Sequence, residues 1–183
     1  MKRVFMCWVL MMLFFQLGVA QQQENIEDVK NTTVTKVGQT VPDFIATTID
    51  SVKINTAELR GKVFLITLFV TWCPTCNAEL PHLEKDIWQR FKDKNFVVIG
   101  VGREHTKEQL TAFRKKKNLT FFIVPDARRK LYKLFATKYV PRNILVDTSG
   151  KIVYQSEGFN KKDFHKLILK IQELLDQKSG SKL

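Results

Sequence analysis

The sequence predicts a single α/β domain in which helices cover a mixed sheet. Two observations lead to this fold class. Apolar runs with the composition of buried strands alternate with helical patterns through most of the chain. Near the C-terminus, residues 148–150 (Thr-Ser-Gly) separate two further strand-like runs, which is typical of a β-hairpin. The alternation of strands with helices favours parallel strand pairing, whereas a hairpin pairs its strands antiparallel. We therefore expect both kinds of pairing in the sheet.

The predicted strands are short apolar runs. Residues 63–70 form an apolar, partly β-branched run, as expected of a strand that is buried on both faces. Residues 96–101 and 120–124 repeat this pattern, and residues 143–147 and 151–155 flank the turn of the predicted hairpin.

The predicted helices lie between and after these strands. The apolar face of the first helix, which follows the first strand, consists of Leu80, Leu83, Ile87 and Phe91. A charged helix is predicted over residues 106–117. Asp126 can cap a third helix that carries Leu131 and Phe135. The last helix begins after Asn160 and keeps a helical apolar pattern to the end of the domain.

The N-terminus has the layout of a secretory signal. Lys2 and Arg3 precede an apolar run, and small residues up to Ala20 precede a polar stretch. We expect cleavage after Ala20, with an uncleaved membrane anchor as the alternative. The signal predicts a location in the periplasm or extracytoplasmic cell envelope. The predicted divisions are 1–20 (signal peptide), 21–36 (flexible polar leader), 37–178 (domain) and 179–183 (tail).

The chain is basic, with a formal net charge of +12. Two cations and no acids lie in residues 1–20, which leaves +10 for the remainder. Basic runs such as 114–117 would suggest nucleic acid in a cytosolic protein. No aromatic residues interleave with them, as base stacking requires, and the export signal argues against this partner. We therefore interpret the basic runs as solvated helix faces and expect no nucleic acid.

Two cysteines, Cys73 and Cys76, remain after the third, Cys7, is assigned to the signal. A disulfide that closes so short a loop restricts the unfolded chain little, so the pair is a poor structural staple. The first cysteine is expected at a helix N-terminus, where free N–H groups and the helix dipole favour a thiolate. Cys73 is therefore the expected nucleophile, and Cys76 is the expected resolving thiol. Pro74 suits the first helical turn, where its missing N–H is not needed.

A metal site is the competing interpretation of the cysteine pair. A closed zinc site needs four ligands, and the sequence has no second cysteine pair. The three histidines, His82, His105 and His165, are scattered, and each is predicted to be a surface residue. We expect no metal and no cofactor. A non-catalytic copper or zinc chaperone that uses the two cysteines and a histidine remains an alternative.

Several segments together resemble one known family. They are "VGQTVPDF" (37–44), "LRGKVFLITLFVTWCPTCNAELPHLEK" (59–85), "YVPRNILVDTSGKIV" (139–153) and the final helix. They resemble the thioredoxin superfamily, and specifically the exported TlpA- and ResA-like branch that includes membrane-tethered reductases of cytochrome c maturation. The resemblance covers nearly all of the chain after the signal. It implies a thioredoxin-like three-layer sandwich with a mixed central sheet.

The resemblance also implies roles for individual residues. Pro141 matches the family's cis-proline, and with Val140 it belongs to the loop that receives the substrate backbone. Trp72 matches a tryptophan that flanks the cysteine pair. Glu79 matches an acidic residue near the active site, which could move the proton of Cys76. An ordinary exposed acid in the first turns of a helix remains the alternative for Glu79.

The chain departs from the family pattern at four positions. Thr67 occupies the strand position where thioredoxin has a buried aspartate, which gives Glu79 more weight as the proton carrier. Phe69 stands where the branch often has tryptophan. Arg142 and Asn143 replace the small hydroxyl residues that usually follow the cis-proline, which leaves the substrate-facing surface, and so the substrate, undefined.

These features predict an exported thiol–disulfide oxidoreductase. The resemblance implies that it reduces client proteins with disulfides, such as apocytochrome c, and receives electrons from a membrane donor thiol protein. The N-terminal segment is a potential membrane tether. The alternatives are a disulfide-forming oxidase, a thiol peroxidase and the metal chaperone. The peroxidase is disfavoured, because neither cysteine completes the Pro-x-x-x-Thr-x-x-Cys pattern.

Overall fold

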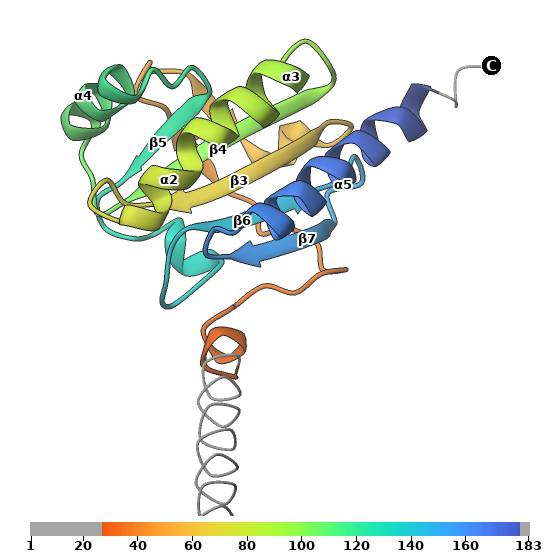
Figure 1. The fold of residues 1–183 in the computed structure, drawn as a ribbon, viewed down its shortest axis with the longest axis horizontal. Helices are drawn as coiled ribbons and strands as arrows, with labels where there is room; N and C mark the ends of the chain where they lie inside the picture. The colour runs from red at the N-terminus through yellow and green to blue at the C-terminus, as the bar shows by residue number, and fades with distance from the viewer. Residues whose placement is uncertain (1–26, 180–183) are drawn as a thin grey trace, which may run out of the picture.

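The computed structural model describes residues 27–179, and its centre is a five-stranded sheet (Figure 1). The strands, in the spatial order β5-β4-β3-β6-β7, are β5 (Phe122–Asp126), β4 (Phe96–Arg103), β3 (Val63–Phe69), β6 (Arg142–Val146) and β7 (Ile152–Glu157). β3, β4 and β5 pair in parallel, whereas β6 pairs antiparallel with both β3 and β7. The predicted mixed sheet is therefore confirmed. The predicted signal peptide lies outside the described residues.

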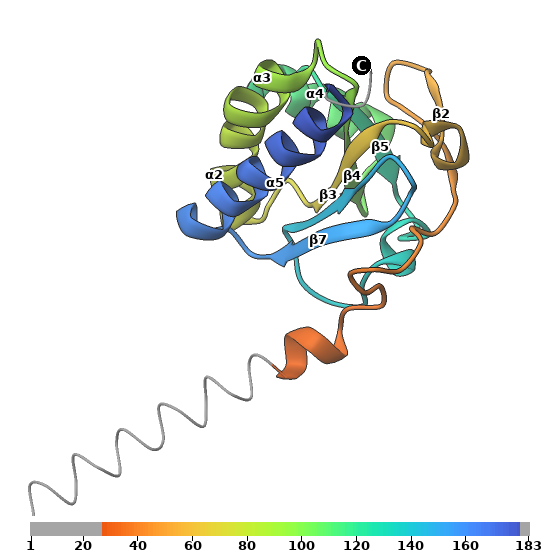
Figure 2. The same ribbon diagram turned by 90° about the vertical axis from the view of Figure 1, so that its right-hand side faces the viewer.

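The sheet is the middle of three layers. One layer contains the helices α2 (Pro74–His82), α3 (Gln89–Phe91), α4 (Lys107–Lys117) and α5 (Lys161–Ser179). The opposite layer contains β1 (Ile45–Thr47), β2 (Lys53–Asn55) and the 3₁₀ turns η1 (Thr56–Leu59) and η3 (Tyr132–Leu134). Figure 2 shows α2, α3 and α5 on one side of the sheet and β2 on the other. Side chains of β3 alternate between the layers: Leu65 packs with the helices, and Ile66 packs with the opposite layer.

The helix after the cysteine pair packs as its apolar spacing predicts. Its four predicted inward residues are all fully buried; they are Leu80, Leu83, Ile87 and Phe91. The helix is not uniform, because α2 contains Pro81, which has no N–H to donate. The chain continues as the π-helical segment η2 (Leu83–Trp88) before α3. The periodicity predicted the buried face, although not this local change in hydrogen bonding.

The predicted third helix is wrong. Asp126 ends β5, and its carboxylate accepts a hydrogen bond from the backbone N–H of Tyr132 at 2.8 Å. Arg129 has a φ of 58°, in the left-handed region, which interrupts any helix that starts near Asp126. Only the short turn η3 forms there, and it turns Tyr132 and Phe135 into the core opposite the helices.

The chain joins the domain before the predicted start at residue 37. Residues 27–36, here called the N-terminal strap, begin as a short helical segment (Figure 1) and then pair with the chain that follows η3, where Thr33 forms an antiparallel bridge with Ala136. The hydroxyls of Thr32 and Thr33 accept hydrogen bonds from the Arg142 guanidinium at 3.0 Å and 2.8 Å. The N–H of Val34 donates to the Phe135 carbonyl at 2.9 Å. Within residues 27–179, no helix combines the length and apolar character needed to cross a membrane.

Candidate active site

Cys73 lies where β3 gives way to α2. It is the N-cap residue of α2, and its Sγ accepts a hydrogen bond from the backbone N–H of Cys76 at 3.1 Å. Pro74 occupies the first turn, as predicted. Cys73 is partly exposed and Cys76 is fully buried, and both thiols are free in this structure. The first sulfur is therefore accessible to a second protein, whereas the second sulfur is accessible only from within the site.

Burial raises the pKa of the Cys76 thiol well above its ordinary value, and the hydrogen bond with Cys73 raises it further. The negative charge of Glu79 acts in the same direction. Because the thiolate is the nucleophile, Cys76 needs a nearby group that accepts its proton before it can attack another sulfur.

The loop before β6 faces the cysteine pair. The Val140–Pro141 peptide bond is cis. The carbonyl oxygen of Val140 lies 3.7 Å from the Sγ of Cys73. This placement agrees with the position that the resemblance implies for Val140 and Pro141 beside the nucleophile.

Glu79 is almost completely buried, with 1% of its surface exposed. It lies one helical turn after Cys76 on α2, and its Oε1 accepts a hydrogen bond from the Asn143 side-chain amide at 2.6 Å. Burial raises the pKa of Glu79 to about 7, and the bond from Asn143 acts in the opposite direction. The alternative of an ordinary exposed acid does not describe this side chain. A carboxyl group with this pKa can take up and release a proton near neutral pH.

Trp72 and His105 form an edge of the site. Trp72 is 60% exposed, and its ring contacts the ring of His105 edge to face at a centroid distance of 4.7 Å. The prediction of His105 as a surface residue is wrong, because only 2% of it is exposed. Its Nε2 accepts a hydrogen bond from the backbone N–H of Thr71 at 2.9 Å, which ties the chain before Trp72 to the end of β4. Burial lowers the pKa of His105, which favours this neutral, accepting form.

Sequence analysis placed Asn143 at the substrate-facing surface, whereas it is buried against Glu79, and it did not connect His105 with this site. A weak signal for each was present. The carboxyl ends of parallel strands meet at one edge of a sheet, so residues that follow β3 and β4 become neighbours there. Asn143 lies two residues after the cis-proline, and strand alternation determines which layer it faces.

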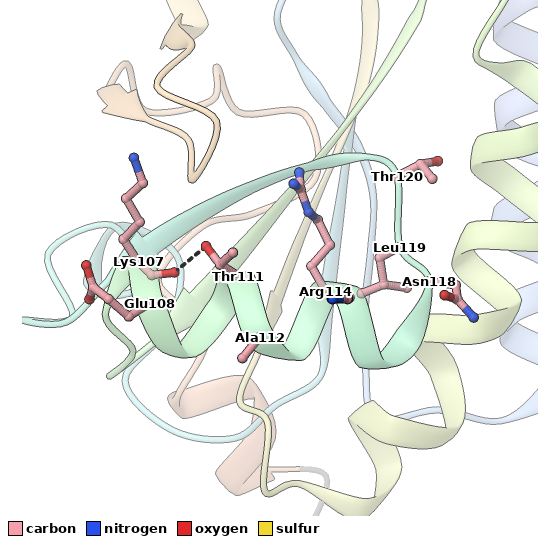
Figure 3. Close-up of a pocket in the computed structure, with 9 residues that line it drawn as sticks. Lys107, Glu108, Thr111, Ala112, Arg114, Asn118, Leu119 and Thr120 are labelled. Carbon is pink, nitrogen blue, oxygen red and sulfur yellow. Dashed lines mark hydrogen bonds between the residues drawn. The ribbon is translucent and has the colours of Figure 1, made fainter.

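The other two histidines, which the metal-chaperone alternative would need as candidate ligands, do not lie at the cysteines. His82 contacts Asp86 on its own helix at 2.9 Å, and His165 is exposed on α5. Among the described residues, no three histidine, cysteine or acidic side chains form a cluster that could hold a metal. A cavity of about 820 Å³ lies along α4, away from the cysteine pair. Figure 3 shows its lining, where the Thr111 hydroxyl donates to the Lys107 carbonyl.

Known proteins share this fold and much of the sequence pattern. Residues 36–168 match the Redoxin family. The thiol-disulfide oxidoreductase ResA of Bacillus cereus is 26% identical over 128 residues, which cover 70% of this chain and 73% of that protein. The solution structure of a proposed protein disulfide isomerase from Bacteroides thetaiotaomicron is 32% identical, with a TM-score of 0.77 over 79% of this chain and 93% of that one.

The crystal structure of StoA from Bacillus subtilis is 22% identical and shares the fold, with a TM-score of 0.60 over 70% of this chain and 97% of that one. The family match spans more than half of the chain, and the cysteine pair lies within it. The chain therefore belongs to the Redoxin family, as a thiol–disulfide oxidoreductase of the ResA-like branch of the thioredoxin superfamily.

Proposed function

We propose that this protein is an exported protein-disulfide reductase that uses Cys73 and Cys76 as its redox couple. The observation that carries the proposal is the contrast within the pair. Cys73 is accessible at a helix N-terminus, and Cys76, one turn later, is fully buried with its N–H directed at the Cys73 sulfur. This arrangement suits an exchange in which the accessible thiol reacts with the client and the buried thiol reacts only with the mixed disulfide between the protein and the client.

The reaction has two steps. The Cys73 thiolate attacks one sulfur of a client disulfide, which breaks that bond, forms a mixed disulfide and releases the other client sulfur as a thiolate. Cys76 then loses its proton and attacks the Sγ of Cys73, which releases the second client thiol. The client gains two electrons and two protons, and the Cys73–Cys76 pair becomes a disulfide. A donor thiol protein must reduce the pair again before the next cycle.

The other site residues have supporting roles in this proposal. Glu79 accepts the proton of Cys76, since it is buried beside that thiol and its pKa lies near 7. The backbone of Val140 and Pro141 receives the client chain next to Cys73, where the Val140 carbonyl already lies close to the sulfur. Trp72 offers an exposed aromatic surface beside the nucleophile.

The resemblance and the predicted signal support an extracytoplasmic location, in the periplasm or at the cell envelope. There the clients are proteins with disulfides, such as apocytochrome c before haem attachment. The electron donor is a membrane thiol protein. If the predicted signal stays uncleaved, residues 1–20 tether the domain to the membrane.

Trapping in cells tests the proposal. The Cys76→Ser variant is expected to accumulate mixed disulfides with clients, because the first step proceeds and the second cannot. The Cys73→Ser variant is expected to accumulate none and is the matched control. The trapped species are identified by non-reducing electrophoresis and mass spectrometry. Equal trapping by both variants, or by neither, would contradict the two-step mechanism.

A further inference from the structure

A row of polar side chains crosses the helix-covered face of the sheet. Thr67 on β3, Asn143 on β6 and Ser156 on β7 are direct partners in the strand register. Strand partners direct their side chains to the same face, so the three lie side by side beneath α2. Thr67 and Asn143 are buried and Ser156 is partly exposed, so the row runs from the core towards the β7 edge.

Glu79 meets this row at Asn143. The Asn143 amide nitrogen lies 2.6 Å from Glu79 Oε1 and 3.5 Å from the Ser156 hydroxyl. The second oxygen, Glu79 Oε2, is buried and makes no hydrogen bond within the described part of the chain. The amide therefore holds one carboxylate oxygen and leaves the other available.

Within residues 27–179, no lysine, arginine or histidine forms an ion pair or hydrogen bond with Glu79, and its donor is the Asn143 amide. The titratable groups that interact with it are Cys76 on its own helix and Tyr154 on β7. The strands beneath it contribute the neutral side chains of Thr67 and Asn143. A hydrogen bond to a buried carboxylate stabilises the ionised form, which is the form that can accept a proton.

Resting on the proposed function, we propose that Asn143 is a positioning residue for the resolving step. Its amide fixes the Glu79 carboxylate so that the free Oε2 is available to take the proton of Cys76. In this step the S–H bond of Cys76 breaks and the proton passes to Oε2. The Cys76 sulfur then forms the S–S bond with Cys73, the bond between Cys73 and the client sulfur breaks, and the client leaves as a thiolate that takes a proton from solvent. Glu79 later returns the proton to solvent.

Asn143→Leu tests this assignment, because leucine has the same branched side-chain shape with four heavy atoms and cannot donate to Glu79. Ser156→Ala is the matched control in the same row, since it leaves the bond between Asn143 and Glu79 intact. Asn143→Ser provides a milder change if the leucine variant fails to fold. The probe is oxidised glutathione, and quenched-flow mass spectrometry separates formation of the glutathione mixed disulfide from its resolution.

We expect Asn143→Leu to move the pH midpoint of resolution upward by about one to two units, since a hydrogen bond to a charged group has about that strength. Formation of the mixed disulfide should stay within twofold of wild type. NMR titration of the Glu79 carboxyl carbon should show the same upward shift. In the Glu79→Gln background, Asn143→Leu should cause no further loss, because the effect of Asn143 acts through the Glu79 carboxyl, which that background lacks.

The experiment distinguishes failure of the role proposed for Asn143 from failure of the proposed function. An unchanged resolution profile and an unchanged Glu79 titration in both Asn143 variants would overturn the role of Asn143. Additive losses in the double variant would do the same, because they would indicate a merely structural effect. If the wild-type protein forms no mixed disulfide with glutathione or with clients, the proposed function fails, and the role of Asn143 in resolution fails with it.

Discussion

Replacing Glu79 by glutamine is expected to stabilise the reduced protein against unfolding at and above neutral pH. Burial raises the pKa of this carboxyl from 4.5 to about 7 in the folded protein. The unfolded chain therefore loses the proton first as the pH rises, and the folded state retains it. Because the folded state binds more protons between these two values, its stability falls as the pH rises through them.

The size of the effect follows from the pKa difference. The pKa of Glu79 shifts from 4.5 to about 7, which is about 2.5 units. At about 1.36 kcal/mol per unit, the free energy of unfolding of the wild-type protein falls by about 3 kcal/mol as the pH rises. The loss begins near pH 4.5 and is nearly complete by pH 8. Glutamine does not titrate, so the free energy of unfolding of the variant does not fall in this way. Relative to wild type, the variant should gain about 3 kcal/mol of stability across this pH range.

Urea unfolding of the reduced proteins from pH 4.5 to 8.5 measures this difference. The range ends at 8.5 because the raised pKa of Cys76 adds its own loss of stability at higher pH. Glu173→Gln, an exposed acid on α5, is the control and should follow the wild-type curve. A Glu79→Gln curve that runs parallel to wild type across the range would refute the claim that burial of Glu79 costs stability.

Two further predictions concern the neighbours of the site. Arg142→Ala should destabilise the protein by about 1–3 kcal/mol in urea unfolding, because the Lys138 carbonyl and the hydroxyls of Thr32 and Thr33 lose their buried donor. Limited proteolysis should then cut the N-terminal strap first, and an unchanged cleavage pattern would contradict the role of Arg142 in holding the strap. The Cys73–Cys76 couple should have a reduction potential on the thioredoxin side of about −200 mV, because no cation contacts the Cys73 sulfur among its described hydrogen-bond partners. Equilibration with a glutathione series measures it, and a value near −120 mV, typical of strong oxidants, would contradict the reductase direction.

Most of the fold could be predicted from the sequence because its elements carry strong local patterns. The run over 63–70 is apolar at every position but one, and it became the central strand β3. The last helix has apolar residues at helical spacing over its whole length and became α5. The predicted third helix does not form, although Asp126 is a suitable capping residue. The backbone of Arg129 is in the left-handed region, which interrupts a helix there. A left-handed residue without glycine leaves little trace in a single sequence.

The site could be predicted only in part, for a related reason. Cys73 and Cys76 are three residues apart at the start of a helix, so their sequence spacing is enough to predict that their side chains are neighbours. The environment of Glu79 depends on Asn143, which is distant in the chain and reaches Glu79 only through the pairing of β3 with β6. His105 is likewise positioned by the end of β4. Contacts of this kind depend on which strands the sheet topology brings together, so short-range sequence patterns do not predict them.

The two residues after the cis-proline connect its loop to both layers of the protein. They are neighbours on β6, so their side chains point to opposite faces of the sheet. Arg142 points towards the N-terminal strap and donates to Thr32 and Thr33, whereas Asn143 points towards α2 and donates to Glu79. These two departures from the family pattern therefore lie within the protein, since only 5% of Arg142 and 1% of Asn143 are exposed, and not on its surface as the sequence had suggested. Under the proposed function, client choice depends on exposed neighbours such as Trp72, and the two buried side chains hold the cis-proline loop and the proposed proton carrier Glu79 in place.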